Sequence, residues 1–541
     1  MTEDDRSKLA RDAAGAADDR ALDGGRYQSY LYAYPHKTAY RRIDPPLPLG
    51  PLWAGEQRDA LFLYVHVPFC EQRCGFCNLF TQPVPEADRV EAYLGTLARQ
   101  ATVVRRALDE GGAFAIARAA IGGGTPTLLA PAQLERVLGA MRRLGYARAP
   151  MSVETSPETA LPDRLAILVG GGADRVSIGV QSFLDEECRA VNRPQRAADV
   201  HRALRAIRDA RPAALNIDLM YGLPGQTEQT WRASLEAALA YRPEELYLYP
   251  LYVRPLTTLG RKATRAVAAV SEGGGGGQGA MGAMGAMLQA LSAPAPAMTP
   301  ADAAEHDRRS ALYEQGRTLL LAAGYRQISM RMFRLDPTAA ASATSATSAA
   351  AAAAGAASAA AGAASAATMS RSAGSAGAPV AGATATFGNH VGPVYCCQDD
   401  GMIGIGCGAR SYTRGVHYSS EWAVGARGVR EIIDRWIARP DEAFAVADYG
   451  FVLDAAEQRR RWLILSLLSD EGLDPDAYRR RFARDAAADF PELAELLARG
   501  LAVTAGGALR LTPEGLARAD AIGPWLASPE VRRRMAEYEL S

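Results

Sequence analysis

The chain has 541 residues, a length that allows roughly two to four domains. Its 60 Lys and Arg residues balance its 60 Asp and Glu residues, so the net charge gives no support for nucleic acid or an acidic membrane surface as a partner. No apolar run is long enough to span a bilayer, and seven cysteines are too few to form a disulfide framework in a chain of this length.

The first 60 residues divide into two parts. Residues 1–25 are rich in Ala, Asp, Gly and Arg without an apolar period, so we expect them to be disordered. They also lack the apolar core of a signal peptide, which favours a cytoplasmic location. Residues 26–60 contain a tyrosine-dense text and a Pro-rich turn at 45–51, and they predict an ordered N-terminal arm.

Residues 61–260 alternate between short apolar runs and longer helix-like stretches. Repetition of strand and helix at this spacing predicts a parallel sheet with covering helices. Six units favour an open, partial (β/α)6 TIM-like barrel over a closed barrel of eight units, and the chemistry of such a barrel lies at the C-terminal ends of its strands. The predicted strands are 61–67, 115–122, 151–155, 174–180, 214–222 and 245–252, and the predicted helices are 86–109, 131–145, 158–170, 185–210 and 227–241.

Low-complexity segments interrupt the second half of the chain. Residues 271–300 are rich in Gly, Ala and Pro, and residues 337–385 are almost entirely Ala, Ser, Gly and Thr. Both predict inserted loops without catalytic content, because they carry too little apolar side chain to offset the entropy of ordering. Residues 301–335 predict a barrel extension, with one helix and then a strand at 327–333, and residues 386–450 predict a segment that completes the barrel.

The last part of the chain, residues 454–541, predicts a separate α+β domain. Three helix-like segments precede a hairpin pattern at 501–512 and a final helix at 513–522. This order is typical of a winged-helix-like domain. DNA binding is one interpretation, but the neutral charge of the chain favours a protein-contact or lid module, and we expect no nucleic-acid partner.

Three cysteines follow the first predicted strand within eight residues, at Cys70, Cys74 and Cys77. Thiolates at this C-x3-C-x2-C spacing can bind three irons of a [4Fe–4S] cluster and leave one iron open. Zinc sites prefer four ligands in paired C-x2-C groups, and no second pair follows. An open iron can chelate the amino and carboxylate groups of S-adenosylmethionine (SAM). An electron passed to the cluster would then break the sulfonium–carbon bond and form a 5′-deoxyadenosyl radical, which abstracts hydrogen from a substrate.

Motifs at the ends of the other predicted strands accompany the cysteines. The text IGGGTP at 121–126 follows the second strand, Glu154 ends the third and Gln181 ends the fourth. Arg193 stands in VNRP, and Asp218 stands in NIDLMYGLPGQT on the fifth strand. Together with the cysteine motif, these texts resemble radical SAM proteins of the oxygen-independent coproporphyrinogen III oxidase family, which also contains the heme chaperones.

The resemblance covers residues 27–335 and 395–420 and the C-terminal domain, and it implies roles for single residues. The glycine strip would bind the SAM amino group, Arg193 the SAM carboxylate, and Asp218 the ribose or a second SAM molecule. Tyr64 would lie near SAM or the substrate, and Phe76 would pack either beside the adenine or in the core. The expected cluster ligands are Cys70, Cys74 and Cys77, and the expected SAM-site residues are Tyr64, Phe76, Gly123, Gly124, Thr125, Glu154, Gln181, Arg193 and Asp218.

Two departures from the family indicate a divergent branch. The oxidases carry a fourth cysteine two positions after the third, where this chain has Leu79. The heme chaperones have a text similar to Glu-Ile-Ser-Asn-Phe where this chain reads QISMRMF at 327–333. In contrast, the tyrosine-rich arm at 30–36 is similar to the N-terminal segment of the oxidases.

Three functions remain open on this basis. The first is a radical SAM oxidoreductase that acts on a small molecule, a tetrapyrrole or another organic acid, with an electron donor such as flavodoxin or ferredoxin. The second is a heme-binding or heme-transfer chaperone, and the third is radical modification of an unknown substrate such as a peptide. The possible axial heme ligands are His36, His66, His390 and His417, although His66 is better suited to support the cysteine loop.

Overall fold

The computed structural model describes residues 25–31, 33–193, 195–272, 300–336 and 401–539, together with Leu22. Most of the segment 1–25, most of the insertion 271–300, all of the insertion 337–385, and His390 lie outside the described residues. No helix in the described ranges has the length and apolar character needed to cross a membrane.

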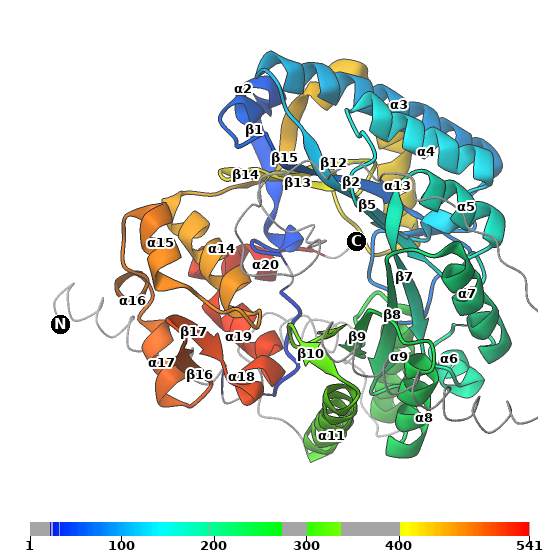
Figure 1. Ribbon diagram of the computed structural model, residues 1–541, viewed down its shortest axis with the longest axis vertical. Coiled ribbons are helices and arrows are strands. Elements are labelled where there is room, and N and C mark those ends of the chain that lie inside the picture. Colours follow the sequence, from blue (N-terminus) through cyan, green and yellow to red (C-terminus); the bar gives the residue numbers. More distant parts are fainter. Residues whose placement is uncertain are drawn as a thin grey trace, which may run out of the picture.

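Six neighbouring parallel strands form the middle of the large sheet (Figure 1). They lie where the apolar runs predict them, and they pair in chain order. Most of their side chains are buried, because helices cover the outer face and the inner face lines the barrel. The strands are β2 (Leu61–Val67), β5 (Ile116–Gly123), β6 (Met151–Thr155), β7 (Ala173–Gln181), β8 (Ala214–Tyr221) and β9 (Glu245–Pro250).

Amphipathic helices connect these strands on the outside of the sheet (Figure 1). The stretch 185–210 was predicted as one helix, and this is wrong, because it forms the two helices α6 and α7. Asn192 between them has a φ of 55°, a left-handed conformation that asparagine tolerates better than most residues and that a helix cannot contain. The helices are α3 (Ala87–Glu110), α4 (Pro131–Arg143), α5 (Pro162–Gly170), α6 (Asp185–Ala190), α7 (Ala197–Ala210) and α8 (Glu228–Leu239).

The sheet continues beyond both ends of the six parallel strands and comprises thirteen strands, in an open order. Beyond β9 lie β11 and β10, which follow helix α11 (Pro300–Ala322). Beyond β2 lies one more parallel strand, β12, followed by antiparallel strands. These outer strands are β1 (Arg41–Pro48), β10 (Tyr325–Gln327), β11 (Met332–Leu335), β12 (Met402–Ile405), β13 (Arg410–Tyr412), β14 (Val416–Ser419) and β15 (Val446–Val452).

The single strand predicted at 327–333 is also wrong. Gln327 ends β10 and Met332 begins β11, so this text is the turn of a hairpin. The Ser329 hydroxyl accepts hydrogen bonds from the backbone N–H groups of Arg331 and Met332, at 3.3 and 3.2 Å. A serine side chain that satisfies two backbone donors stabilises a turn against an extended strand.

The C-terminal domain has the predicted order of helices followed by a hairpin. Strands β16 and β17 pair in antiparallel fashion across Gly506 and Gly507, whose φ values of 60° and 80° suit a tight hairpin turn. The elements are α14 (Ala455–Leu467), α15 (Pro475–Phe482), α16 (Ala486–Asp489), α17 (Glu492–Ala498), β16 (Ala502–Ala505), β17 (Ala508–Leu511), α18 (Pro513–Ala517), α19 (Ala519–Leu526) and α20 (Pro529–Ala536).

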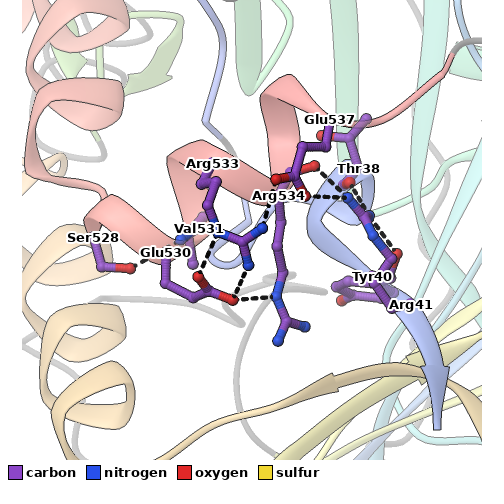
Figure 2. Close-up of polar contacts among 9 residues, drawn as sticks. All are labelled: Thr38, Tyr40, Arg41, Ser528, Glu530, Val531, Arg533, Arg534 and Glu537. Carbon is purple, nitrogen blue, oxygen red and sulfur yellow. Dashed lines mark hydrogen bonds and ion pairs between the residues drawn. The ribbon is translucent and has the colours of Figure 1, made fainter.

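The N-terminal arm joins the C-terminal domain to the sheet. Tyr34 and Tyr40 of the arm are buried in the same hydrophobic core as Leu463 and Trp525 of the C-terminal domain. Figure 2 shows the polar part of this contact, in which Arg41 donates hydrogen bonds to backbone carbonyls of the arm and of helix α20. The arm and the C-terminal domain are therefore packed as one unit.

Candidate functional site

The three cysteines lie on a loop that leaves the first barrel strand. Cys70 belongs to the short strand β3 (Phe69–Cys70), which pairs with β4 (Gln82–Pro83) and so brings the two ends of the loop together. The Cys77 N–H donates to the Cys74 carbonyl at 3.0 Å, which forms a tight turn between these two cysteines. All three side chains are partly accessible and carry free thiols.

Each thiol has a polar neighbour. The Thr125 hydroxyl donates to Cys70 Sγ at 3.6 Å, and Arg193 Nη1 donates to Cys74 Sγ at 3.0 Å. The Thr81 hydroxyl lies 3.9 Å from Cys77 Sγ. Burial raises the pKa of Cys70 to about 12, and the neighbouring Cys77 raises it further. Burial thus disfavours the free thiolate forms of Cys70 and Cys77.

This donor set suits an iron–sulfur cluster. Thiolate is the ligand that the irons of such clusters require, and each thiolate binds its own iron atom. In the part of the chain that the structure describes, no group of three or more His, Cys, Asp or Glu side chains is placed to hold a single metal ion. The cysteines, with their hydrogen-bond donors, are the residues that would hold the cluster.

The glycine strip at the end of β5 packs directly against the cysteine loop. A Cβ on Gly124 would lie 2.5 Å from the Phe69 carbonyl oxygen and 2.9 Å from Cys70 Sγ. Gly123 has a φ of 117°, a conformation that L side chains rarely adopt, and a Cβ there would meet the His66 ring at 2.7 Å. Only glycine allows this close approach, so the strip lies in direct contact with the first cysteine and with His66.

Two carboxylates face the interior of the barrel beside this strip. Glu154 on β6 accepts a hydrogen bond from the Gly123 N–H at 2.9 Å. Solvent can reach its side chain, even though many protein atoms lie around the carboxylate. Burial among those atoms raises the pKa of Glu154, and the Gly123 N–H opposes this shift. Burial raises the pKa of Asp218 on β8 to about 6, and the negative charge of Glu154 contributes to that rise. The two carboxylates therefore share one site.

Asp218 is held by a polar network inside the barrel. Asn216 Nδ2 donates to Asp218 Oδ1 at 2.8 Å and to the Ser177 hydroxyl at 2.7 Å. The Ser177 hydroxyl in turn lies 3.5 Å from Asp218 Oδ2. These two neighbours were not among the predicted site residues. Ser177 and Asn216 alternate with apolar residues along β7 and β8, and this pattern could have identified them from the sequence.

Arg193 connects the end of β7 to the middle cysteine. Besides Cys74, its guanidinium donates to the Gly179 carbonyl and, at 2.9 Å, to the Gln195 side chain. Gln181 ends β7 with a φ of 70°, and its amide nitrogen would lie 2.9 Å from a Cβ on Gly179. The structure therefore brings Gln181 and Arg193 to the same strand end.

Tyr64 and His66 on β2 form a hydrogen-bonded pair beneath the loop. The Tyr64 hydroxyl lies 3.1 Å from His66 Nδ1, and His66 Nε2 lies 3.1 Å from the Phe80 carbonyl oxygen. A carbonyl only accepts, so Nε2 carries the proton and Nδ1 accepts from Tyr64. Burial lowers the pKa of His66 to about 4, which keeps the imidazole neutral. His66 thus ties the strand to the far side of the cysteine loop.

Phe76 does not join this polar group. Its ring packs against an apolar cluster of Val191, Met220, Leu223 and Leu251 on the β8 and β9 side of the loop. This surface is apolar, so it suits a flat ring as well as core packing. The other expected residues gather in two adjoining groups, one around Cys70, Gly124 and Glu154 and the other around Cys74 and Arg193.

Comparisons with known proteins place two regions of the chain in described families. The family model of the Radical SAM superfamily matches residues 64–238, and that of the HemN C-terminal domain matches residues 453–518. The chain is 32% identical over 213 residues to Coproporphyrinogen III oxidase, anaerobic 1, of Cereibacter sphaeroides, which covers 39% of this chain and 44% of that protein. It is also 32% identical over 197 residues to Heme chaperone HemW of Bacillus subtilis, which covers 36% of this chain and 51% of that protein. The chain thus spans about half the length of the curated relatives that it matches.

A solved structure extends the comparison to the whole fold. Coproporphyrinogen III oxidase (HemN) from Escherichia coli, a radical SAM enzyme, matches with a TM-score of 0.60 at 20% identity, over 90% of this chain and 92% of that one. The predicted barrel with a C-terminal α+β domain is thereby confirmed. Residues 64–238 thus match the Radical SAM superfamily, whose cofactors are a [4Fe–4S] cluster and SAM, and residues 453–518 match the HemN C-terminal domain.

Proposed function

We propose that the protein is an oxidase of a carboxylate-bearing small molecule, in the first place a tetrapyrrole such as coproporphyrinogen III, with Cys70, Cys74 and Cys77 as the cluster ligands. The observation that carries this proposal is the packing of the glycine strip against the first cysteine, together with the hydrogen bond from the Gly123 N–H that holds Glu154 beside the strip. When bound there, the cluster and SAM supply a 5′-deoxyadenosyl radical.

The residues beside the cysteine loop have separable tasks. Glu154 and the glycine strip offer acceptors for an ammonium group, and the guanidinium of Arg193 offers donors for a carboxylate. Asp218, which Asn216 orients, offers an acceptor for a ribose hydroxyl. Together they would orient SAM over the cysteine loop and exclude water from it.

Basic groups near the site support a carboxylate-bearing substrate. Burial lowers the pKa of His36 in the arm well below its ordinary value, and the positive charges of Lys37, Arg410 and Arg254 act in the same direction, so these three cations lie within electrostatic reach of His36. Lys37 and Arg410 also act on His66 beneath the cysteine loop. A concentration of positive charge beside the site favours an anionic substrate. Relatives that are named coproporphyrinogen III oxidases support a tetrapyrrole with propionate groups.

The heme-chaperone alternative has a named relative but less support from the histidines. Both ring nitrogens of His66 are engaged by Tyr64 and Phe80, and His417 is fully buried against Tyr412. His36 Nδ1 lies 2.8 Å from the Thr38 hydroxyl. These placements favour structural roles over axial ligation of a heme.

The test is an anaerobic assay of the reconstituted enzyme with dithionite, SAM and coproporphyrinogen III. We expect 5′-deoxyadenosine together with a vinyl product that has lost CO2. Formation of 5′-deoxyadenosine without any change in the porphyrinogen would overturn the tetrapyrrole assignment and direct the search to peptide substrates. Tight heme binding without turnover would favour the chaperone.

A further inference from the structure

The cysteine loop reaches the molecular surface next to its third cysteine. Leu79, two residues after Cys77, has an apolar side chain that is 47% exposed. Its backbone N–H interacts with the Cys77 thiol. Only Asn78 separates Leu79 from Cys77 in the chain, so a partner that contacts Leu79 lies close to a proposed cluster ligand.

The first turn of helix α9 (Thr258–Glu272) contacts the same loop. The Leu259 N–H donates to the Gly75 carbonyl at 2.9 Å, and a Cβ on Gly75 would lie 3.2 Å from Leu259 Cγ. Gly75 lies between Cys74 and Cys77, so the first turn of the helix is fixed against the cluster-binding segment.

The start of this helix carries a basic stripe. Arg261, Lys262 and Arg265 are all exposed, and their spacing places them along one side of the helix. A fourth cation, Arg73, extends the stripe into the cysteine loop, where it donates to the Cys77 carbonyl at 3.3 Å. The positive charge of Arg261 acts on Arg73, so the charges of the loop and of the helix lie within electrostatic reach of one another.

The nearest carboxylate of the loop faces another way. Glu71 interacts with Glu158 and with the charges of Arg164 and Arg193, on the side of the loop that faces β6 and β7. Leu79, Arg73, Arg261, Lys262 and Arg265 are hereafter called the loop–helix surface, which combines one exposed apolar side chain with four basic side chains.

We propose that the loop–helix surface docks an acidic one-electron carrier protein, and this proposal rests on the proposed reductive cleavage of SAM. One electron would leave the carrier and enter the cluster. Electron transfer through protein slows steeply with distance, so a carrier has to dock where the cluster ligands lie closest to the surface. Exposed Lys and Arg side chains around a small apolar centre attract an acidic partner and orient it, and they act mainly on the rate of association.

The experiment compares a protein reductant with a small one. The reconstituted holoenzyme is supplied with SAM and either reduced flavodoxin, which is an acidic carrier, or dithionite, and 5′-deoxyadenosine formation is measured. We expect the double variant Arg261→Glu/Lys262→Glu to lower kcat/KM for flavodoxin at least tenfold and to lose its dependence on ionic strength. The rate with dithionite should stay within twofold. Leu79→Asp should behave in the same way.

Matched controls separate a local effect from a general one. Arg205→Glu/Arg232→Glu reverses two exposed charges on α7 and α8, and Leu497→Asp replaces a leucine that is 44% exposed on α17. Both should keep the full rate with flavodoxin. Equal losses with both reductants, or an unchanged rate with flavodoxin in the loop–helix variants, would overturn the proposal.

A binding measurement keeps the docking proposal distinct from the proposed function. Flavodoxin binding to the holoenzyme is measured by fluorescence anisotropy, independently of turnover. Weaker binding only in the loop–helix variants would support the docking surface, whether or not SAM is cleaved. Absence of SAM cleavage would contradict only the proposed function. Equal binding by all variants would contradict the docking surface.

Discussion

The backbone N–H of Gly123 donates a hydrogen bond of 2.9 Å to Oε2 of Glu154, and this contact joins the ends of β5 and β6 beside the cysteine loop. It requires a φ of 117° at Gly123 and the absence of a Cβ on the flanking glycines, because a Cβ on Gly122 would lie 2.8 Å from the same oxygen. The glycine strip, the carboxylate and the first cysteine thus depend on one another.

Gly124→Ala tests this dependence. The added Cβ would lie 2.5 Å from the Phe69 carbonyl oxygen, so the cysteine loop has to move away from β5. We expect the iron content after reconstitution to fall below half of the wild-type value, as measured by iron and sulfide analysis. The control is Gly139→Ala on α4, where a Cβ meets nothing within 4 Å. It should keep the full iron content and gain about 1 kcal/mol of stability. Full iron content in Gly124→Ala would contradict the packing argument.

Asp218→Asn separates ligand binding from stability. Burial raises the pKa of Asp218 from 3.8 to about 6, so the folded protein holds a proton at pH values where the unfolded chain has released it. Stability therefore falls as the pH rises from about 4 to 6, and the ionised carboxylate costs on the order of 2–3 kcal/mol at pH 7. We expect Asp218→Asn to raise the Tm at pH 7 while it weakens SAM binding at least tenfold.

In the wild type, SAM affinity should increase as the pH rises through about 6, because only the ionised carboxylate is a pure acceptor. The measurement is equilibrium binding of SAM to the reconstituted enzyme between pH 5 and 8. An unchanged affinity in Asp218→Asn would show that the carboxylate does not contact SAM.

His66→Gln should change the response to acid. Burial lowers the pKa of His66 from 6.5 to about 4, so the unfolded chain binds a proton first as the pH falls. Stability from this group is present above pH 6.5 and is lost progressively down to about pH 4, by about 3 kcal/mol in total. We expect the Tm of the wild type to fall more steeply with acid than that of His66→Gln. Parallel Tm curves for the two proteins would contradict this account.

A buried ion pair joins the β10–β11 turn to the C-terminal domain. Arg331 binds Asp520 on α19, with side-chain exposures of 4% and 2%, and Asp520 also accepts a hydrogen bond from Tyr252. Arg331→Met leaves a buried carboxylate without its cation, which should cost about 3–5 kcal/mol. The double variant Arg331→Met/Asp520→Leu should regain most of that loss. Thermal unfolding measures both, and equal Tm values for the single and double variants would contradict a coupled pair.

The sequence predicts the parts of the site in which chemistry restricts the residue type. Three thiolates, a glycine strip and charged residues at successive strand ends are all visible as local texts, because parallel strands bring their C-terminal ends to one edge. The ion pair between Arg331 and Asp520 leaves no such trace, since its partners are 189 residues apart and become neighbours only after packing.

Local breaks in regular structure were predicted less well. The left-handed conformation of Asn192 splits a stretch with continuous helical character, and the Ser329 side chain turns an apolar text into a hairpin. Each depends on one local conformation, and the periodicity of apolar residues in the sequence does not reveal such a conformation. Asn216 is an intermediate case. Its place in the alternation of polar and apolar residues on β8 is visible in the sequence, but its hydrogen bond to Asp218 is not.

The most direct test of the account is the reductive cleavage of SAM by the anaerobically reconstituted protein and its Cys74→Ala variant. The account predicts that the wild type binds about four irons per chain and forms 5′-deoxyadenosine when a reductant and SAM are added. It predicts that Cys74→Ala loses most of the iron and forms none. A wild-type protein with a full cluster that does not cleave SAM, or a Cys74→Ala variant that keeps a full cluster, would contradict it.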